Sequence, residues 1–109
     1  PYDPLFSCIE AHYSGQYFGA SISALDSLAR QKGYYFIGSN SAGNNAYFLK
    51  NEFLDTIPSK RIDECFIAAK FRDERNQNGE LLFSSRQSSI SAIRGMPVFN
   101  VKTKKIEDF

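Results

Sequence analysis

The chain has 109 residues, of which 42% are hydrophobic and 23% are charged, a balance that is ordinary for one small folded domain. Thirteen Lys and Arg residues stand against twelve Asp and Glu residues, so the net charge of +1 gives no support to nucleic acid as a partner. No apolar run approaches the roughly 18 residues of a membrane span, and no signal segment begins the chain. We therefore expect a cytoplasmic protein without a membrane partner.

The cysteines and the first residue add two further expectations. Cys8 and Cys65 match no metal-ligand spacing and no redox pair, so we predict buried free thiols and no metal site. The chain begins at Pro1 without an initiator Met, and we expect it to be a segment of a longer polypeptide.

In chain order, residues 1–18 are predicted to form an irregular, exposed approach loop, because they are rich in aromatic and turn-forming residues. From Gly19 the pattern changes, and apolar residues recur at helical spacing between Ile22 and Ala29. Gly33 can take the left-handed conformation that ends a helix. The sequence therefore predicts a helix that ends at Gly33.

An antiparallel β-hairpin is predicted directly after this helix. Residues 34–37 and 46–49 are aromatic and β-branched runs of strand length. The Gly, Ser and Asn residues of the loop between them, residues 38–45, tolerate turn conformations. Residues 19–58 are thus expected to form a unit made of a helix and a hairpin.

Residues 59–109 are expected to form a helical and irregular extension. An apolar pattern predicts a helix of about three turns in residues 59–69, and the mixed charges of residues 70–75 are typical of a solvated helix end. A short third helix is predicted in residues 84–94 and a strand in residues 98–101, followed by a tail.

The sequence offers no convincing catalytic group. His12 is the single histidine, and nothing in the spacing places a carboxylate or nucleophile beside it. Neither cysteine has a neighbouring histidine or cationic cluster that would lower its pKa. Lys102, Lys104 and Lys105 are interpreted as a solvated turn, with a phosphate or membrane contact as the alternative.

Two nucleotide-binding motifs can also be tested. Gly38 and Gly43 have the spacing of a phosphate-binding loop, but the Lys and Ser or Thr that should follow are absent, and a strand is predicted where a helix is required. The chain contains no G-x-G-x-x-G motif. We predict no cofactor-binding residue.

Binding residues are easier to suggest than catalytic ones. Asn40, Asn44 and Asn45 either set the turn geometry of the hairpin loop or reach a ligand pocket, and their amides suit recognition more than proton transfer. Tyr17 and Phe18 either pack in the core or form an aromatic wall beside a pocket.

Several segments together resemble a known family, and the strongest of them is the hairpin loop with its Asn-Ser-x-Gly-x-Asn pattern after a helix. The segments that carry the likeness are Pro1–Pro4, Tyr17–Ser21 with Leu25 and Leu28, Lys32–Tyr34, Gly38–Leu49, Phe71–Gly79 and Arg94–Val101. In this order they resemble the C-terminal part of FkbM-like, S-adenosylmethionine-dependent methyltransferase-fold proteins.

The resemblance implies an α/β fold, in which this chain is a C-terminal fragment of a Rossmann-like methyltransferase fold. It implies S-adenosylmethionine as the cofactor of the parent protein, bound by the family's N-terminal half, so that the missing N-terminal part is the expected partner. No catalytic residue is carried over. The residues expected on the methyl-acceptor side are Tyr17, Phe18, Asn40, Asn44 and Asn45.

A second hypothesis is an interaction or dimerisation module without catalytic activity. The edges of a hairpin invite pairing with another chain, and aromatic residues such as Tyr35 and Tyr47 are hard for so short a chain to cover. A homodimer is the partner that this alternative predicts.

Overall fold

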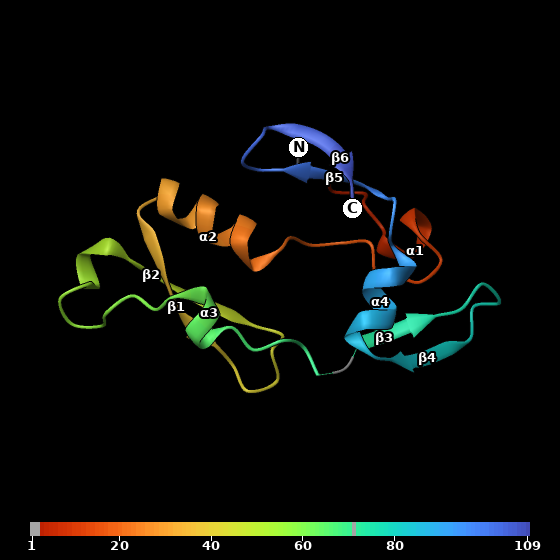
Figure 1. The fold of residues 1–109 in the computed structure, drawn as a ribbon, viewed down its shortest axis with the longest axis horizontal. Helices are drawn as coiled ribbons and strands as arrows, with labels where there is room; N and C mark the ends of the chain where they lie inside the picture. Colours follow the sequence, from red (N-terminus) through yellow and green to blue (C-terminus); the bar gives the residue numbers. More distant parts are fainter. Residues whose placement is uncertain (1–2, 71) are drawn as a thin grey trace. The chain divides into compact units, whose positions relative to one another are not determined.

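The computed structural model describes residues 3–70 and 72–109 and shows a mixed α/β chain of short helices and small antiparallel hairpins (Figure 1). Pro1, Tyr2 and Phe71, which carry part of the resemblance, lie outside these residues. The elements are α1 (Cys8–Ala11), α2 (Ile22–Gln31), β1 (Tyr34–Ser39), β2 (Ala46–Lys50), η1 (Asn51–Phe53), α3 (Ile62–Cys65), β3 (Arg72–Arg75), β4 (Leu81–Ser84), α4 (Arg86–Ala92), β5 (Pro97–Asn100) and β6 (Lys105–Asp108).

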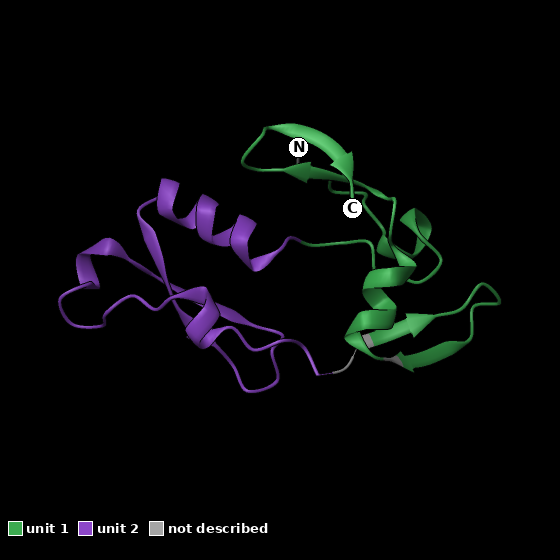
Figure 2. Ribbon diagram, in the orientation of Figure 1, with its two compact units in different colours: residues 1–19, 71–109 green, residues 20–70 purple. Residues whose placement is uncertain are grey.

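The chain divides into two compact units (Figure 2). Residues 20–70 are continuous in sequence and form the insert unit, whereas residues 1–19 and 71–109 together form the split unit. The insert unit contains α2, β1, β2, η1 and α3, and the split unit contains the other elements.

The insert unit confirms the predicted helix and hairpin. The hydroxyl of Ser21 accepts a hydrogen bond from the amide of Ala24 at 3.1 Å, so α2 begins at the next residue, Ile22. Gly33 follows the helix with a φ of +78°, as a left-handed cap requires. β1 and β2 then pair antiparallel, with a register irregularity between Phe36 and Gly38.

The core of the insert unit is small. Among the described residues, Tyr35 and Phe36 are the buried apolar side chains, with exposed fractions of 3% and 0%. Consecutive strand residues point to opposite faces, so the burial of both Tyr35 and Phe36 means that both faces of β1 are covered. α2 and α3 both contact this strand. Tyr35 also donates its hydroxyl to the carbonyl of Ile57 at 2.6 Å. The expectation that Tyr35 is left uncovered is therefore wrong.

The predicted three-turn helix in residues 59–69 is also wrong in length. α3 covers only Ile62–Cys65, and Phe66 is already extended, with φ −75° and ψ 125°. The chain then runs back to the hairpin loop, where the amide of Lys70 donates to the carbonyl of Ala42 at 3.3 Å. This tertiary contact overrides the helical pattern of the sequence.

The split unit contains two hairpins, β3–β4 and β5–β6, both antiparallel. Residues 72–75 form a strand, so their interpretation as a helix end is wrong. β5 confirms the predicted strand to within one residue, and α4 is shorter than the predicted third helix. β6 occupies the predicted tail, which pairs with β5.

The predicted approach loop contains more order than expected. α1 forms one helical turn there, with the hydroxyl of Ser7 accepting from the amide of Glu10 at 3.4 Å. The amide of Arg75 in β3 donates to the carbonyl of Ser14 at 3.2 Å. Cys8 and Cys65 are free thiols, as predicted, but each is half-buried rather than buried.

Candidate functional site

The hairpin loop brings Asn40, Asn44 and Asn45 together. The side-chain oxygen of Asn40 accepts from the amides of Asn44 and Asn45, both at 3.1 Å, and its side-chain nitrogen donates to Oδ1 of Asn44 at 2.6 Å. The side-chain nitrogen of Asn45 donates to the same Oδ1 at 3.3 Å. The three amides therefore bond within the loop and fix its conformation. Their role on the acceptor side stays a prediction.

The same loop also packs against the connection between α3 and β3, where its residue Gly43 lies close to the backbone. Gly43 has a φ of +75°, and a Cβ placed on it would lie 2.3 Å from the carbonyl oxygen of Ala68. The amide of Lys70 bonds the neighbouring carbonyl of Ala42. The conformation of the loop is thus fixed by tertiary contacts, because its backbone packs directly against that of the α3–β3 connection.

Replacing Asn40 with alanine is expected to destabilise the chain by about 0.5–1.5 kcal/mol, because the exposed amides of Asn44 and Asn45 exchange their shared acceptor for water. Asn40→Asp keeps that oxygen and serves as the matched control, with a smaller expected loss. Urea unfolding measures both changes. Equal losses in the two variants would contradict the assignment of the Asn40 oxygen as the organising group.

Tyr17 and Phe18 belong to the split unit, whereas the three asparagines belong to the insert unit. The hydroxyl of Tyr17 donates to the carbonyl of Pro97 at the start of β5, which ties this segment to the β5–β6 hairpin. Phe18 is exposed, so it is no core side chain. The structure thus assembles the asparagines into one loop and places the two aromatic residues elsewhere in the chain.

A polar cluster in the split unit was not predicted. Ser14, Gln16, Glu74 and Ser89 are all buried. The Ser14 hydroxyl oxygen lies 2.8 Å from Nδ1 of His12 and accepts from the amide of Gln16 at 3.2 Å. A serine beside a histidine suggests a nucleophile, but Ser14 has an exposed fraction of 0%, so a substrate cannot reach it. The pair organises a turn.

Glu74 is the charged member of that cluster. It lies on β3, and its Oε2 is 3.2 Å from the hydroxyl of Ser89 on α4. The Gln16 side chain donates to the neighbouring carbonyl of Asp73. These bonds hold β3 between α4 and the segment after α1. Sequence reasoning missed Glu74 because its partners are remote in the chain.

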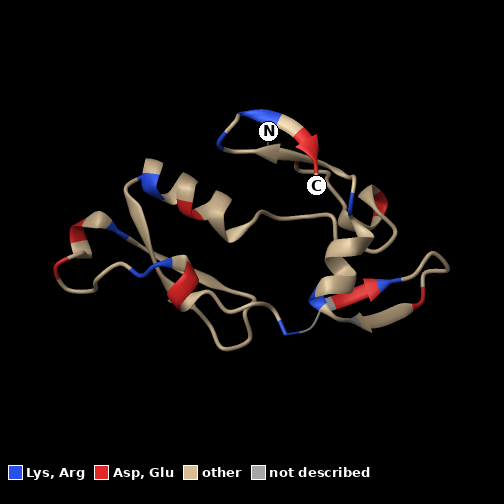
Figure 3. Cartoon of the chain, in the orientation of Figure 1, with Lys and Arg blue, Asp and Glu red and all other residues tan. Residues whose placement is uncertain are grey.

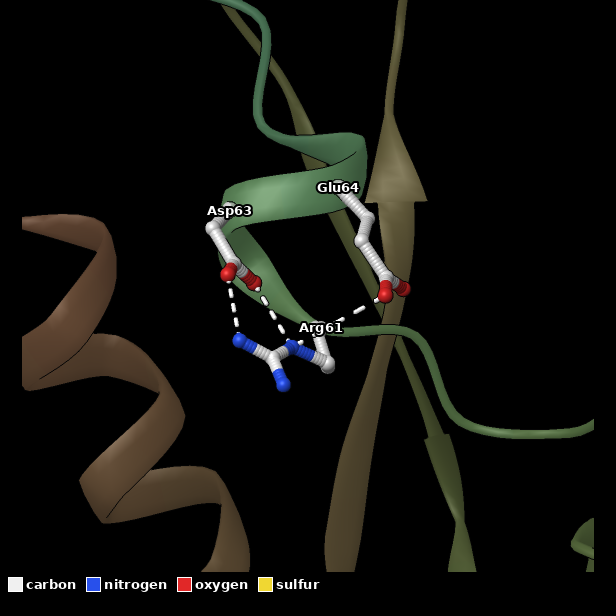
Figure 4. A network of polar contacts seen from close by, with 3 residues as sticks. All are labelled: Arg61, Asp63 and Glu64. Carbon is white, nitrogen blue, oxygen red and sulfur yellow. Dashed lines mark hydrogen bonds and ion pairs between the residues drawn. The ribbon is translucent and has the colours of Figure 1, made fainter.

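A network of charged contacts in the insert unit surrounds Arg61 (Figure 4). Its Nε donates to Oδ1 of Asp63 at 3.0 Å and lies 3.8 Å from Oε1 of Glu64. The hydrogen bond from Arg61 lowers the pKa of Asp63 below its usual value, and the same contact raises the pKa of Arg61. All three side chains are exposed, so this network organises the start of α3 in solvent.

A shallow pocket of about 270 Å³ lies in the insert unit. Its lining residues are Arg30, Tyr34, Tyr35, Asn51, Leu54 and Ser59. The lining contains hydroxyl, amide and guanidinium groups, which suit binding rather than proton transfer. Two of these donors are already used, because Nε of Arg30 bonds Asp26 at 2.8 Å and the hydroxyl of Tyr35 bonds the carbonyl of Ile57. The lining residues have no common spacing in the sequence, and no signal there could have grouped them.

No known protein family, curated protein or solved structure matches this chain. Within residues 3–70 and 72–109, no group of three or more His, Cys, Asp and Glu side chains is placed to hold a metal ion. None of the helices in that part of the chain has the length and apolar character needed to cross a membrane.

Proposed function

We propose that this chain supplies the closing helix and β-hairpin of a methyltransferase-like sheet. It would be the C-terminal part of a FkbM-like, S-adenosylmethionine-dependent methyltransferase-fold protein whose cofactor binds outside this chain. The observation that carries the proposal is the difference between the two edges of the β1–β2 hairpin.

The outer edge of β1 is occupied. The amide of Asn51 donates to the carbonyl of Gly33, and in an antiparallel pair the hydrogen-bonded positions alternate along the strands. The backbone groups of Phe36 therefore point away from β2. The carbonyl of Phe36 is bonded there by the amide of Lys60 at 2.9 Å.

The outer edge of β2 is open. The same alternation of hydrogen-bonded positions shows which of its backbone groups lie there. Phe48 and Lys50 stand opposite Phe36 and Tyr34, so their backbone groups also point away from the hairpin. Within the described residues, β1 is the only strand that pairs with β2. An open strand edge is a surface for a further strand, which supports the missing N-terminal part of the same fold as the partner.

The apolar surface of the insert unit supports the same partner. Leu25 and Leu28 of α2 are exposed, and the buried apolar core described for this unit is confined to β1. So small a core leaves a unit of this size with marginal stability alone. In this proposal, Asn40, Asn44 and Asn45 of the insert unit contact the methyl acceptor by hydrogen bonding, without transferring protons.

Amide hydrogen exchange tests the strand partner. In the chain alone we expect fast exchange at Phe48 and Lys50 and slow exchange at Leu49, which faces β1. Joining the chain to its upstream coding sequence should slow exchange at Phe48 and Lys50. Unchanged exchange there would contradict the proposed pairing.

Proline substitution sharpens this test. Lys50 has a φ of −66°, which a proline ring accepts, so Lys50→Pro removes the outward amide without disturbing the β1 contacts. Lys50→Ala keeps that amide and is the matched control. The extended protein should lose assembly with Lys50→Pro and keep it with Lys50→Ala.

Isothermal titration tests the cofactor separately. We expect the extended protein to bind S-adenosylmethionine and the chain alone not to bind it. Binding by the chain alone would show that the cofactor site lies within it. Failure of the extended protein to bind would end the methyltransferase proposal and leave the strand pairing to be judged on hydrogen exchange.

The second candidate function is self-association through the same edge of β2, which Tyr47 favours because it is 49% exposed beside that edge. Sedimentation of the chain alone separates the two candidates. A homodimer would protect the amides of Phe48 and Lys50 as the protein concentration rises. A strict monomer at tens of micromolar would exclude this function.

A further inference from the structure

We propose that the β5–β6 hairpin is a peripheral membrane-binding element. Phe99 and Ile106 would enter the headgroup region of an anionic bilayer, while Lys102, Lys104 and Lys105 would contact lipid phosphates. This inference goes beyond the proposed function and does not rest on it. It departs from the sequence expectation of no membrane partner because of how the hairpin arranges these residues.

The middle of one face of the hairpin is apolar and exposed. Phe99 and Ile106 stand directly opposite each other in the register, so their side chains share a face. Their exposed fractions are 59% and 74%. Pro97 and its cross-strand partner Asp108 share the same face at the end of the hairpin away from the turn, so the acidic group on this face lies far from the lysines.

The lysines gather at the turn that joins the two strands, which Figure 3 shows in blue. Lys102 and Lys104 lie in the turn, and Lys105 begins β6. All three are exposed. The acidic residues of the hairpin, Glu107 and Asp108, lie toward the other end of β6, and Glu107 is bonded to the side chain of Asn100 at 2.8 Å. The turn is thus locally cationic in a chain of nearly zero net charge.

Hydrogen bonds hold the hairpin in this conformation. The side-chain oxygen of Asn100 accepts from the amides of Lys102 and Thr103 at 2.9 and 3.2 Å, and its carbonyl accepts from the amide of Lys104. At the other end of the hairpin, the amides of Gly95 and Phe109 bond the carbonyls of Phe109 and Met96. A preorganised hairpin loses little conformational freedom on binding.

The exposed apolar residues and the cationic turn together favour a lipid surface as the binding partner. Anionic leaflets attract lysines near the surface, and each contributes about a fivefold gain in binding. Apolar side chains add affinity when they reach the acyl boundary. A polyanion such as nucleic acid would use the lysines but would leave the aliphatic side chain of Ile106 without a role.

The second hairpin of the split unit provides a matched comparison. Leu81 and Phe83 of β4 are also exposed, at 47% and 78%, and share a face. Arg75 and Asp73 stand opposite them, so this face has no local excess of positive charge. The β3–β4 hairpin therefore tests whether exposed apolar residues alone are sufficient for vesicle binding.

Vesicle flotation with the full chain tests the proposal. We expect binding to phosphatidylcholine vesicles that contain phosphatidylserine, weak binding to phosphatidylcholine alone, and loss of binding as salt rises. The triple variant Lys102→Gln, Lys104→Gln, Lys105→Gln should lower partitioning on the order of 100-fold. The double variant Phe99→Thr, Ile106→Thr should lower it roughly tenfold.

Two control variants accompany these. The triple variant Lys50→Gln, Lys60→Gln, Lys70→Gln changes the net charge equally in the insert unit, and Leu81→Thr, Phe83→Thr removes equally exposed apolar groups. Both should bind nearly as the parent chain does. Circular dichroism checks that each variant stays folded, and threonine suits exposed strand positions.

Three results would overturn the proposal. The first is an equal loss of vesicle binding in the control lysine variant and the hairpin lysine variant. The second is full binding after Phe99 and Ile106 are replaced. The third is no vesicle binding but lysine-dependent binding to a DNA oligonucleotide, which would assign the turn to nucleic acid instead.

Discussion

Replacing Phe36 with alanine is expected to unfold the insert unit. Phe36 has an exposed fraction of 0%, and its ring lies 5.6 Å from that of Phe48 across the hairpin. Truncating a buried phenylalanine costs about 3–5 kcal/mol, and whole domains are stable by only about 5–15 kcal/mol. Thermal or urea unfolding monitored in this unit measures the loss.

Phe53→Ala is the matched control, because Phe53 lies in η1 of the same unit and is exposed. The same chemical change there should cost less than about 1 kcal/mol, since little contact is lost. If both variants lost the same stability, the core of the insert unit would not be centred on Phe36.

Replacing Gly43 with alanine is expected to release the hairpin loop from the α3–β3 connection. The new Cβ would lie 2.3 Å from the carbonyl oxygen of Ala68, and the three nearest atoms, in Ala68 and Ala69, all belong to the backbone and cannot rotate away. Left-handed strain costs about 1–2 kcal/mol and overpacking about 1–3 kcal/mol, so a total loss of about 2–5 kcal/mol is expected. Urea unfolding gives the total, and hydrogen exchange at Lys70 reports the local release.

Gly33→Ala separates the cost of left-handed strain from the cost of overpacking. Gly33 has nearly the same φ, +78° against +75°, but a Cβ there meets nothing within 4 Å. This variant should therefore show the conformational cost alone, about 1–2 kcal/mol. Equal losses at the two glycines would mean that the close approach to Ala68 contributes nothing.

The elements that the sequence predicted best are those whose causes are local. α2 depends on apolar spacing, on Ser21 at its start and on Gly33 at its end, all within one short segment. The β1–β2 hairpin follows from two aromatic runs and a loop of small polar residues. Period and turn chemistry suffice for such elements.

The elements that it missed depend on remote partners. Residues 72–75 are charged and show no alternation of apolar and polar residues, yet they pair with β4 and bury Glu74 against Ser89, 15 residues further on. β6 has one apolar residue, Ile106, among three charged ones, and is a strand because β5 pairs with it. Strand pairing of this kind is decided by tertiary context, which sequence period does not encode.

The residues of the candidate site likewise divide into those grouped by local sequence and those whose partners are remote. The asparagine loop was predictable as a cluster because its three residues are close in sequence. Tyr17 and Phe18 precede the unit boundary after Gly19, where the sequence pattern also changes, but the partner of Tyr17, Pro97, is remote in the chain. The lining of the insert-unit pocket is drawn from residues 30–59 and could be found only in the folded chain.

The interrupted sequence of the split unit has a consequence for how the chain is made. Gln16 bonds Asp73 and Tyr17 bonds Pro97, which are 57 and 80 residues away, whereas the insert unit lies entirely between the two parts. At about 5–20 residues per second, Tyr17 waits roughly 4–16 seconds on the ribosome for its partner. The insert unit can fold in that interval and shorten the loop to be closed. During that interval residues 3–19, with exposed Leu5 and Ile9, lack the rest of the split unit and are a segment that a chaperone can bind.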